Sequence, residues 1–173
     1  RWLESVVLAL ELCPFAPDVV RDGRLRIAVA ETTSPPELLV ALDGELALLL
    51  RSEVAALETT LLVHPHALGD FAEYNAFLDS ADALLRARGC EGVVQVASFH
   101  PDYRFAGAAA DDAANWTNRS PHPMLHLLRE QSVADAVDAH PDADGIPHRN
   151  AQRLRAIGAR ALRARVAACT DEA

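Results

Sequence analysis

Apolar residues recur along the chain with two spacings, which predict a succession of helices and strands. A helical spacing follows Asp70, where Asp70 and Glu73 form a capping box and Gly89 ends the last turn. Residues 24–30 alternate apolar and polar positions, and 59–63 and 93–99 are short apolar runs typical of strands. The same reasoning predicts helices over 2–12, 34–51, 70–88, 120–131 and 149–167, with a long functional loop at 102–119.

The order of these elements predicts an α/β fold. We expect a single layered domain over residues 1–173, with a small, at least partly parallel sheet flanked by helices. Residues 149–173 would form a C-terminal Arg-rich helix and tail. A ferredoxin-like α+β fold is the alternative.

Composition narrows the function classes. A net charge of −9 argues against nucleic-acid binding. All 16 basic residues are Arg, which excludes Schiff-base chemistry on lysine. Three cysteines are too few for a disulfide framework, so we expect a reducing, cytoplasmic compartment. No apolar run approaches the ~18 residues of a membrane span, so we expect no membrane partner.

Two predicted strands end alike, in His64-Pro65 and His100-Pro101. Ligands of open α/β sheets bind outside the carboxyl ends of the strands, so we expect both histidines in one site. Whether His64 or His66 points inward stays open. The predicted catalytic residues are His64, His100, Asp102 and Tyr103. The predicted substrate-binding residues are Asn118, Arg119, Ser120 and Arg129, with the anion held partly by a helix that begins after Ser120.

A metal is one interpretation of this cluster. His126 and Glu130 are four residues apart, hence on one face of the predicted helix. With His100 they would form a ligand set for zinc or non-haem iron. A metal-free acid/base site is the second interpretation, and histidines that merely stabilise the strand ends are the third.

The sequence therefore predicts a small enzyme that acts on an anionic small molecule or peptide group, with or without metal assistance. The alternative is a non-catalytic ligand-binding or interaction module. The apolar side of the last helix could also form a homodimer surface.

Five stretches in order carry a resemblance to a known family. They are LELCPFA, ETTLLVHP, DFAEYNAFLDSADALL, EGVVQVASFHPDYRFAG and NWTNRSPHPMLHLLRE. The chain resembles the bacterial domain-of-unknown-function family 1415, which implies a cytosolic protein and supplies no activity. In the family pattern Asn stands where this chain has Glu11, and an aromatic residue where it has His122. These departures lower the odds that Glu11 or His122 is functional. His122 and His126 are also four residues apart, so this pair loses weight as a ligand pair and His126/Glu130 gains.

Overall fold

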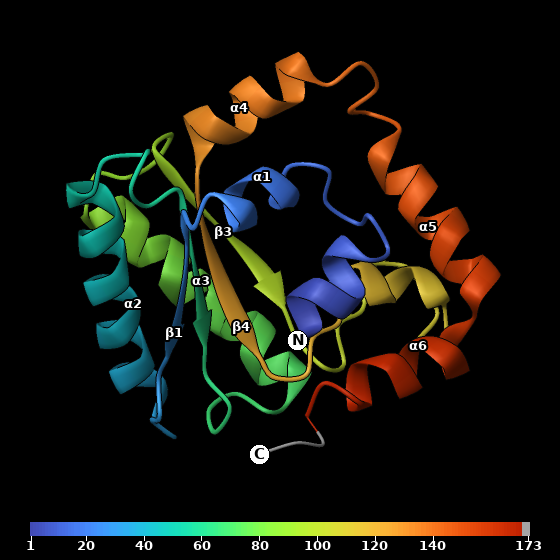
Figure 1. Cartoon of the computed structure of the whole chain (residues 1–173). Helices are drawn as coiled ribbons and strands as arrows, with labels where there is room; N and C mark the ends of the chain where they lie inside the picture. Colours follow the sequence, from blue (N-terminus) through green and yellow to red (C-terminus); the bar gives the residue numbers. More distant parts are fainter. Residues whose placement is uncertain (171–173) are drawn as a thin grey trace.

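The computed structural model describes residues 1–170 and contains a mixed four-stranded sheet (Figure 1). The strands are β1 (Leu25–Val29), β2 (Thr59–Val63), β3 (Val94–Phe99) and β4 (Met124–Arg129), in the order β1-β2-β4-β3. β1 and β2 are parallel, whereas β4 is antiparallel to both of its neighbours. The predicted α/β fold with a partly parallel sheet is confirmed.

Two long helices, α2 (Pro35–Arg51) and α3 (Phe71–Ala87), cover one face of the sheet (Figure 1). Their apolar residues pack with Leu62, Leu125 and Leu127 in one buried cluster. The Asp70 side chain accepts hydrogen bonds from the N–H groups of Ala72 and Glu73, which confirms the predicted N-cap of α3.

The chain ends cover the opposite face of the sheet. The elements on this side are the π-helix η1 (Leu3–Leu8), α1 (Ala16–Arg21), the 3-10 helix η2 (Ala113–Thr117), α5 (Ile146–Ile157) and α6 (Ala159–Ala167). Trp2, Trp116 and Leu154 pack with Leu61 and Met124 in a second buried cluster. The two clusters place apolar layers on both sides of β2 and β4.

The predicted helix at 120–131 is wrong, because residues Met124–Arg129 form the strand β4. Leu125 and Leu127 face α2 and α3, while Met124 points to the opposite face, so the stretch follows a strand period. Its position between β2 and β3 provides pairing on both edges, which outweighs local helix propensity. Helix α4 (Glu130–Ala139) begins only after the strand ends.

The predicted C-terminal helix is divided in two. Gly158 has φ 84°, a backbone conformation that favours glycine and separates α5 from α6. Residues 171–173 of the predicted tail lie outside the described residues. Within residues 1–170, none of the helices is long and apolar enough to cross a membrane.

Candidate functional site

The carboxyl ends of β2 and β3 lie at the same edge of the sheet, although the strands are not neighbours. Both strands are antiparallel to β4, which lies between them, so they run in the same direction. His64 follows β2, His100 follows β3, and both are fully buried. The ring of Tyr74 of α3 packs against both imidazoles, with its centroid 5.9 Å from that of His64 and 5.1 Å from that of His100.

His100 uses both ring nitrogens to hold backbone. Its Nε2 donates to the carbonyl of Leu68 at 3.1 Å, and its Nδ1 accepts from the N–H of Asp102 at 3.0 Å. These bonds require the neutral ring, and burial lowers the pKa of His100 below its ordinary value. Leu68 has φ 56°, so His100 fixes a strained loop residue.

His64 is bound on one side only. Its Nδ1 donates to the carbonyl of Ala67 at 3.0 Å, and its Nε2 is buried without a hydrogen-bond partner among the described residues. Burial also lowers the pKa of His64, which keeps the ring neutral. His66 points away from this cluster and contacts Glu31 at 3.1 Å on the surface. His64, rather than His66, is therefore the inward residue of this pair.

Asp102 and Tyr103 occupy the turn after His100. The Asp102 carboxylate is exposed, and only its backbone N–H contacts His100. The Tyr103 ring packs edge-on against Phe71 and Phe105, with centroids 5.6 Å and 5.0 Å away. Neither side chain orients a histidine for proton transfer.

Asn118, Arg119 and Ser120 also bind backbone. Arg119 is buried with its guanidinium carbon 4.9 Å from the centre of the Trp116 ring. It donates from Nε to the Tyr103 carbonyl at 3.1 Å and from Nη2 to the Ala110 carbonyl at 2.9 Å. The side chains of Asn118 and Ser120 donate to the carbonyls of Ser98 and His122, respectively. All three sit in the irregular connection between η2 and β4, so the predicted helix N-terminus after Ser120 is absent from this segment.

The three predicted metal ligands are not brought together. His126 lies in the middle of β4, where its Nε2 donates to the hydroxyl of Thr59 at 2.8 Å. Glu130 starts α4, four residues and therefore roughly 13 Å further along the strand direction, and away from His100. Within residues 1–170 no group of three or more His, Cys, Asp or Glu is arranged to hold a metal ion. The interpretation of His126 and Glu130 as one helix face fails because this segment is a strand.

Arg129 is the last residue of β4 and lies at the end of the sheet opposite to His64 and His100. Its Nη2 donates to the carbonyls of Leu49, Ser52 and Leu57, at 2.7 Å, 2.7 Å and 3.2 Å. The guanidinium therefore caps the C-terminal end of α2 and the following turn, away from the other residues predicted to bind substrate.

His64, His100, Asp102, Tyr103, Asn118, Arg119 and Ser120 lie at one end of the sheet, and we call them the strand-end cluster. Most of the polar side-chain atoms in this cluster bind the backbone of loops. None of these residues lines either of the two cavities described next.

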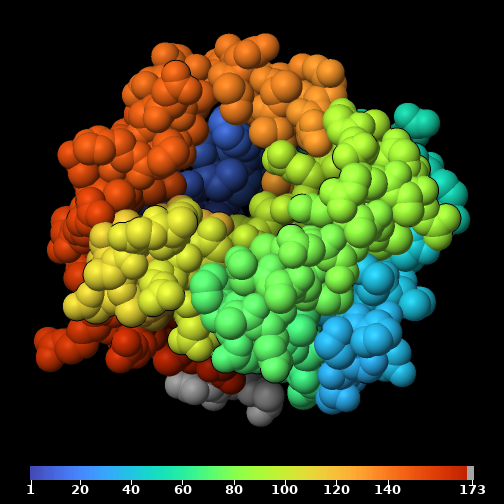
Figure 2. All heavy atoms as spheres, turned by 180° about the vertical axis from the view of Figure 1, so that it is seen from behind, coloured from blue at the N-terminus to red at the C-terminus, as the bar shows by residue number. Residues whose placement is uncertain are grey.

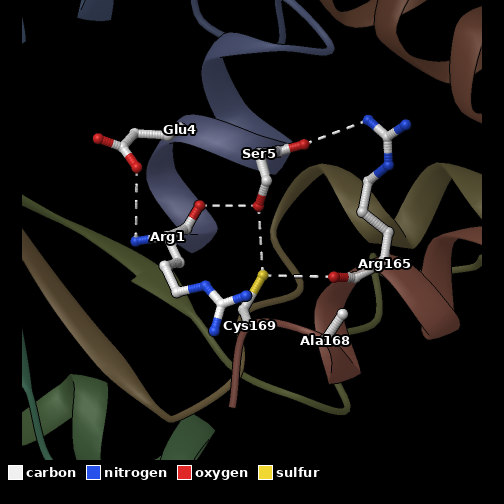
Figure 3. Close-up of a pocket in the computed structure, with 6 residues that line it drawn as sticks. All are labelled: Arg1, Glu4, Ser5, Arg165, Ala168 and Cys169. Atoms are coloured by element: carbon white, nitrogen blue, oxygen red, sulfur yellow. Dashed lines mark hydrogen bonds and ion pairs between the residues drawn. The ribbon is translucent and has the colours of Figure 1, made fainter. Parts of the chain in front are cut away.

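One cavity, of about 380 Å³, lies between η1 and α6 (Figure 3). Its polar groups bind one another. The Ser5 hydroxyl contacts the Cys169 sulfur at 3.3 Å, and the Ser5 carbonyl accepts from Arg165 at 3.2 Å. These contacts fasten the N-terminal helix to α6.

The second cavity, of about 250 Å³, lies between the segment after η1 and the α4–α5 region; we call it the α5 cavity. Figure 2 shows a hollow bordered by the orange atoms of the α4–α5 region, with dark-blue atoms of the N-terminal segment at its floor. The α5 cavity is lined by Glu11, Pro14, His140, Ile146, Arg149, Asn150 and Arg153.

Charged groups of both signs meet in the α5 cavity. Arg153 contacts the Glu11 carboxylate at 2.8 Å and donates to the Leu10 carbonyl. Arg149, one helical turn earlier, is paired with Asp142. Glu11 itself has φ 50°, a left-handed conformation that is strained for a residue with a side chain.

Asn150 and His140 add uncharged polar groups. Asn150 is 5% exposed, and its Nδ2 donates to the Leu12 carbonyl at 2.7 Å, which leaves Oδ1 for another donor. His140 accepts the Asp142 N–H on Nδ1, so in its neutral form Nε2 carries the proton. The sequence signal that could have found these residues is the i, i+4 spacing of Arg149 and Arg153, which places both on one face of the predicted Arg-rich helix.

Comparison with known proteins identifies a family without adding an activity. Neither a curated protein nor a solved structure matches the chain. A family model described as "Protein of unknown function (DUF1415)" matches residues 1–164, so the chain belongs to this family.

Proposed function

We propose that the protein is a non-catalytic binding module for a small molecule that carries a carboxylate, held in the α5 cavity. The observation that carries the proposal is the convergence there of two guanidinium groups, those of Arg149 and Arg153. The Oδ1 of the buried Asn150 can accept a hydrogen bond from an N–H or O–H group of the same ligand. Arg is suited to carboxylates because its planar fork donates two parallel hydrogen bonds.

The surroundings of Arg153 support this ligand class. The Glu11–Arg153 pair is the contact that a ligand carboxylate would share or replace, and Glu11 is exposed enough to turn toward solvent. The strained backbone of Glu11 beside the cavity is typical of functional segments. Ile146 and Pro14 add apolar surface for the rest of the ligand.

The contacts of the strand-end cluster argue against a catalytic role for its residues. Both nitrogens of His100 are engaged with backbone groups, and the Arg119 guanidinium is stacked on Trp116 and bonded to two carbonyls. Buried groups held by backbone carbonyls are not free to transfer a proton to, or to bind, a substrate. Arg149 and Arg153 differ, because each is paired with an exposed carboxylate, of Asp142 and Glu11 respectively, that a ligand carboxylate can displace.

The test is thermal denaturation with a panel of small carboxylates, amino acids and inorganic phosphate, followed by calorimetry on the compounds that raise Tm. A ligand at 100 times its Kd adds about 2.7 kcal/mol of stability. We expect a carboxylate to stabilise the wild type and to lose this effect in Arg153→Gln. Arg160→Gln, which removes the same charge from an exposed residue of α6, is the matched control and should retain binding.

Mass spectrometry of the bound compound after incubation separates binding from catalysis. Recovery of the unchanged compound agrees with the proposal, whereas turnover refutes the non-catalytic role. Absence of stabilisation by every carboxylate, or equal binding by Arg153→Gln, refutes the assignment to the α5 cavity.

A further inference from the structure

Strand β1 has an open edge and apolar residues that are exposed beside it. Within residues 1–170, β1 pairs with β2 and with no other strand, so its other side ends the sheet (Figure 1). Ile27 is 58% exposed and Val29 is 55% exposed. Natural proteins usually protect an edge strand with charges, proline or a covering segment, because an open edge pairs readily with another strand.

The hydrogen bonds of β1 show which backbone groups face the open edge. The Ala30 N–H donates to the Val63 carbonyl at 2.8 Å, and the Arg24 carbonyl accepts from the Glu58 N–H at 2.8 Å. Even-numbered residues therefore direct their backbone groups toward β2. Because this direction alternates along a strand, the N–H and C=O groups of Leu25, Ile27 and Val29 point away from β2.

The charged residue in the middle of β1 does not shield this edge. Arg26 donates from Nε and Nη2 to the two carboxylate oxygens of Glu45 on α2, at 2.7 Å and 3.0 Å. This fork holds the guanidinium over the helix-covered face. The side chains of Leu25, Ile27 and Val29 lie on the opposite face, where Leu25 packs against the second buried cluster.

We propose that β1 pairs with β1 of a second copy of this chain, in an antiparallel dimer centred on Ile27. In this register Ile27 faces Ile27 of the second copy, and Leu25 faces Val29 on each side. The three residues with outward backbone groups on each chain then exchange six hydrogen bonds, and all six apolar side chains lie on one face.

The sequence favours this register over the two registers that are shifted by two residues. Sliding one copy by two residues places Arg26 opposite Arg26 of the second copy. Sliding it by two residues the other way places Leu25 opposite the exposed Glu31. Only the register centred on Ile27 pairs apolar with apolar at every outward position, and this self-complementarity favours a second copy over an unrelated strand.

The dimer should be reversible. A pair of five-residue strands buries less than the ~1,600 Å² that is standard for stable complexes, so we expect association at roughly micromolar concentrations. Sedimentation velocity of the full chain from about 5 to 200 µM tests this expectation. A monomer throughout this range refutes the proposal.

Substitution at the centre tests the register. Ile27→Glu and Ile27→Lys each place two like charges opposite one another and should weaken self-association at least roughly ten-fold. A mixture of the two variants should associate again, because glutamate then faces lysine. Val137→Glu, at a 39% exposed position on α4, is the matched control and should dimerise like the wild type. Self-association of both Ile27 variants, or no association in the mixture, contradicts the register.

Amide exchange on the wild type tests the same register without any substitution. The N–H groups of Leu25, Ile27 and Val29 should become more protected as concentration rises, while that of Val137 should not change. Protection that is independent of concentration refutes the pairing.

Discussion

Replacement of His100 tests whether the strand-end cluster is a catalytic centre or a structural one. His100→Ala removes the donor to the Leu68 carbonyl and the acceptor for the Asp102 N–H. Each unsatisfied group costs about 1–3 kcal/mol, with the lower value at Asp102, where water has access. Loss of ring contacts with Tyr74 and Phe71, whose centroids lie at 5.1 Å and 5.3 Å, adds about 1 kcal/mol.

The expected total is about 4 kcal/mol, measured as the free energy of unfolding in urea at pH 7.5. With an m value of about 2 kcal/mol/M, the midpoint should fall by about 2 M. His100→Asn retains an acceptor for the Asp102 N–H, and His100→Gln retains a donor for the Leu68 carbonyl, so each should recover part of the loss. A catalytic histidine is instead removed with little effect or a gain in stability. A destabilisation below about 1 kcal/mol in His100→Ala would therefore refute our assignment of a structural role.

Three further predictions follow from named contacts. Burial lowers the pKa of His126 to about 4. The neutral ring therefore contributes at most about 3 kcal/mol to the free energy of unfolding, and this contribution is complete above pH 6.5 and is lost as the pH falls toward 4. Urea titrations at pH 7.5, 6 and 5 should show this loss. His126→Gln should remove the part that comes from His126, whereas the part from His64 and His100, whose pKa values burial also lowers, should remain. Arg129→Met leaves the carbonyls at the end of α2 without their donor and should cost about 2–3 kcal/mol in the same assay; a cost near zero would show that water replaces the guanidinium. Glu11→Asn should raise the free energy of unfolding by about 0.5 kcal/mol, because Asn tolerates φ 50° better than Glu does; a loss of stability would mean that the contact with Arg153 outweighs the strain.

The parts of the fold with complete local signals were predictable from the sequence. Asp70, Glu73 and Gly89 mark both ends of α3, and the short apolar runs that end in His64 and His100 mark two strands. Residues Met124–Arg129 were not predictable in this way. Their helical interpretation rested on a Ser-Pro start, whereas the strand is selected by pairing with β2 and β3, which are far away in the sequence.

The candidate site, too, was predictable from the sequence only in part. Convergence of His64 and His100 follows from strand direction, which the sequence indicates through the connecting helix α3. The hydrogen-bond partners of the two histidines could not be predicted from the sequence, because they are the main-chain carbonyls of Leu68 and Ala67, which carry no sequence signature. Polar side chains at a strand end are equally compatible with chemistry and with loop support, and only the hydrogen bonds distinguish these roles.

The same hydrogen bonds predict how a ligand would change the dynamics of the protein. None of the residues of α4 is buried. At the α5 cavity, two contacts connect α5 to the segment after η1: Asn150 donates to the Leu12 carbonyl, and Arg153 pairs with Glu11. Segments with little buried surface open locally at low free energy, so amides of α4 and the start of α5 should exchange early. A ligand that contacts both walls of the cavity binds the closed arrangement better than the open one and should slow exchange there. Exchange in α3, on the other face of the sheet, should stay unchanged. Equal slowing in α3 would indicate global stabilisation by a ligand bound elsewhere, and no slowing in α5 would place the ligand outside the cavity.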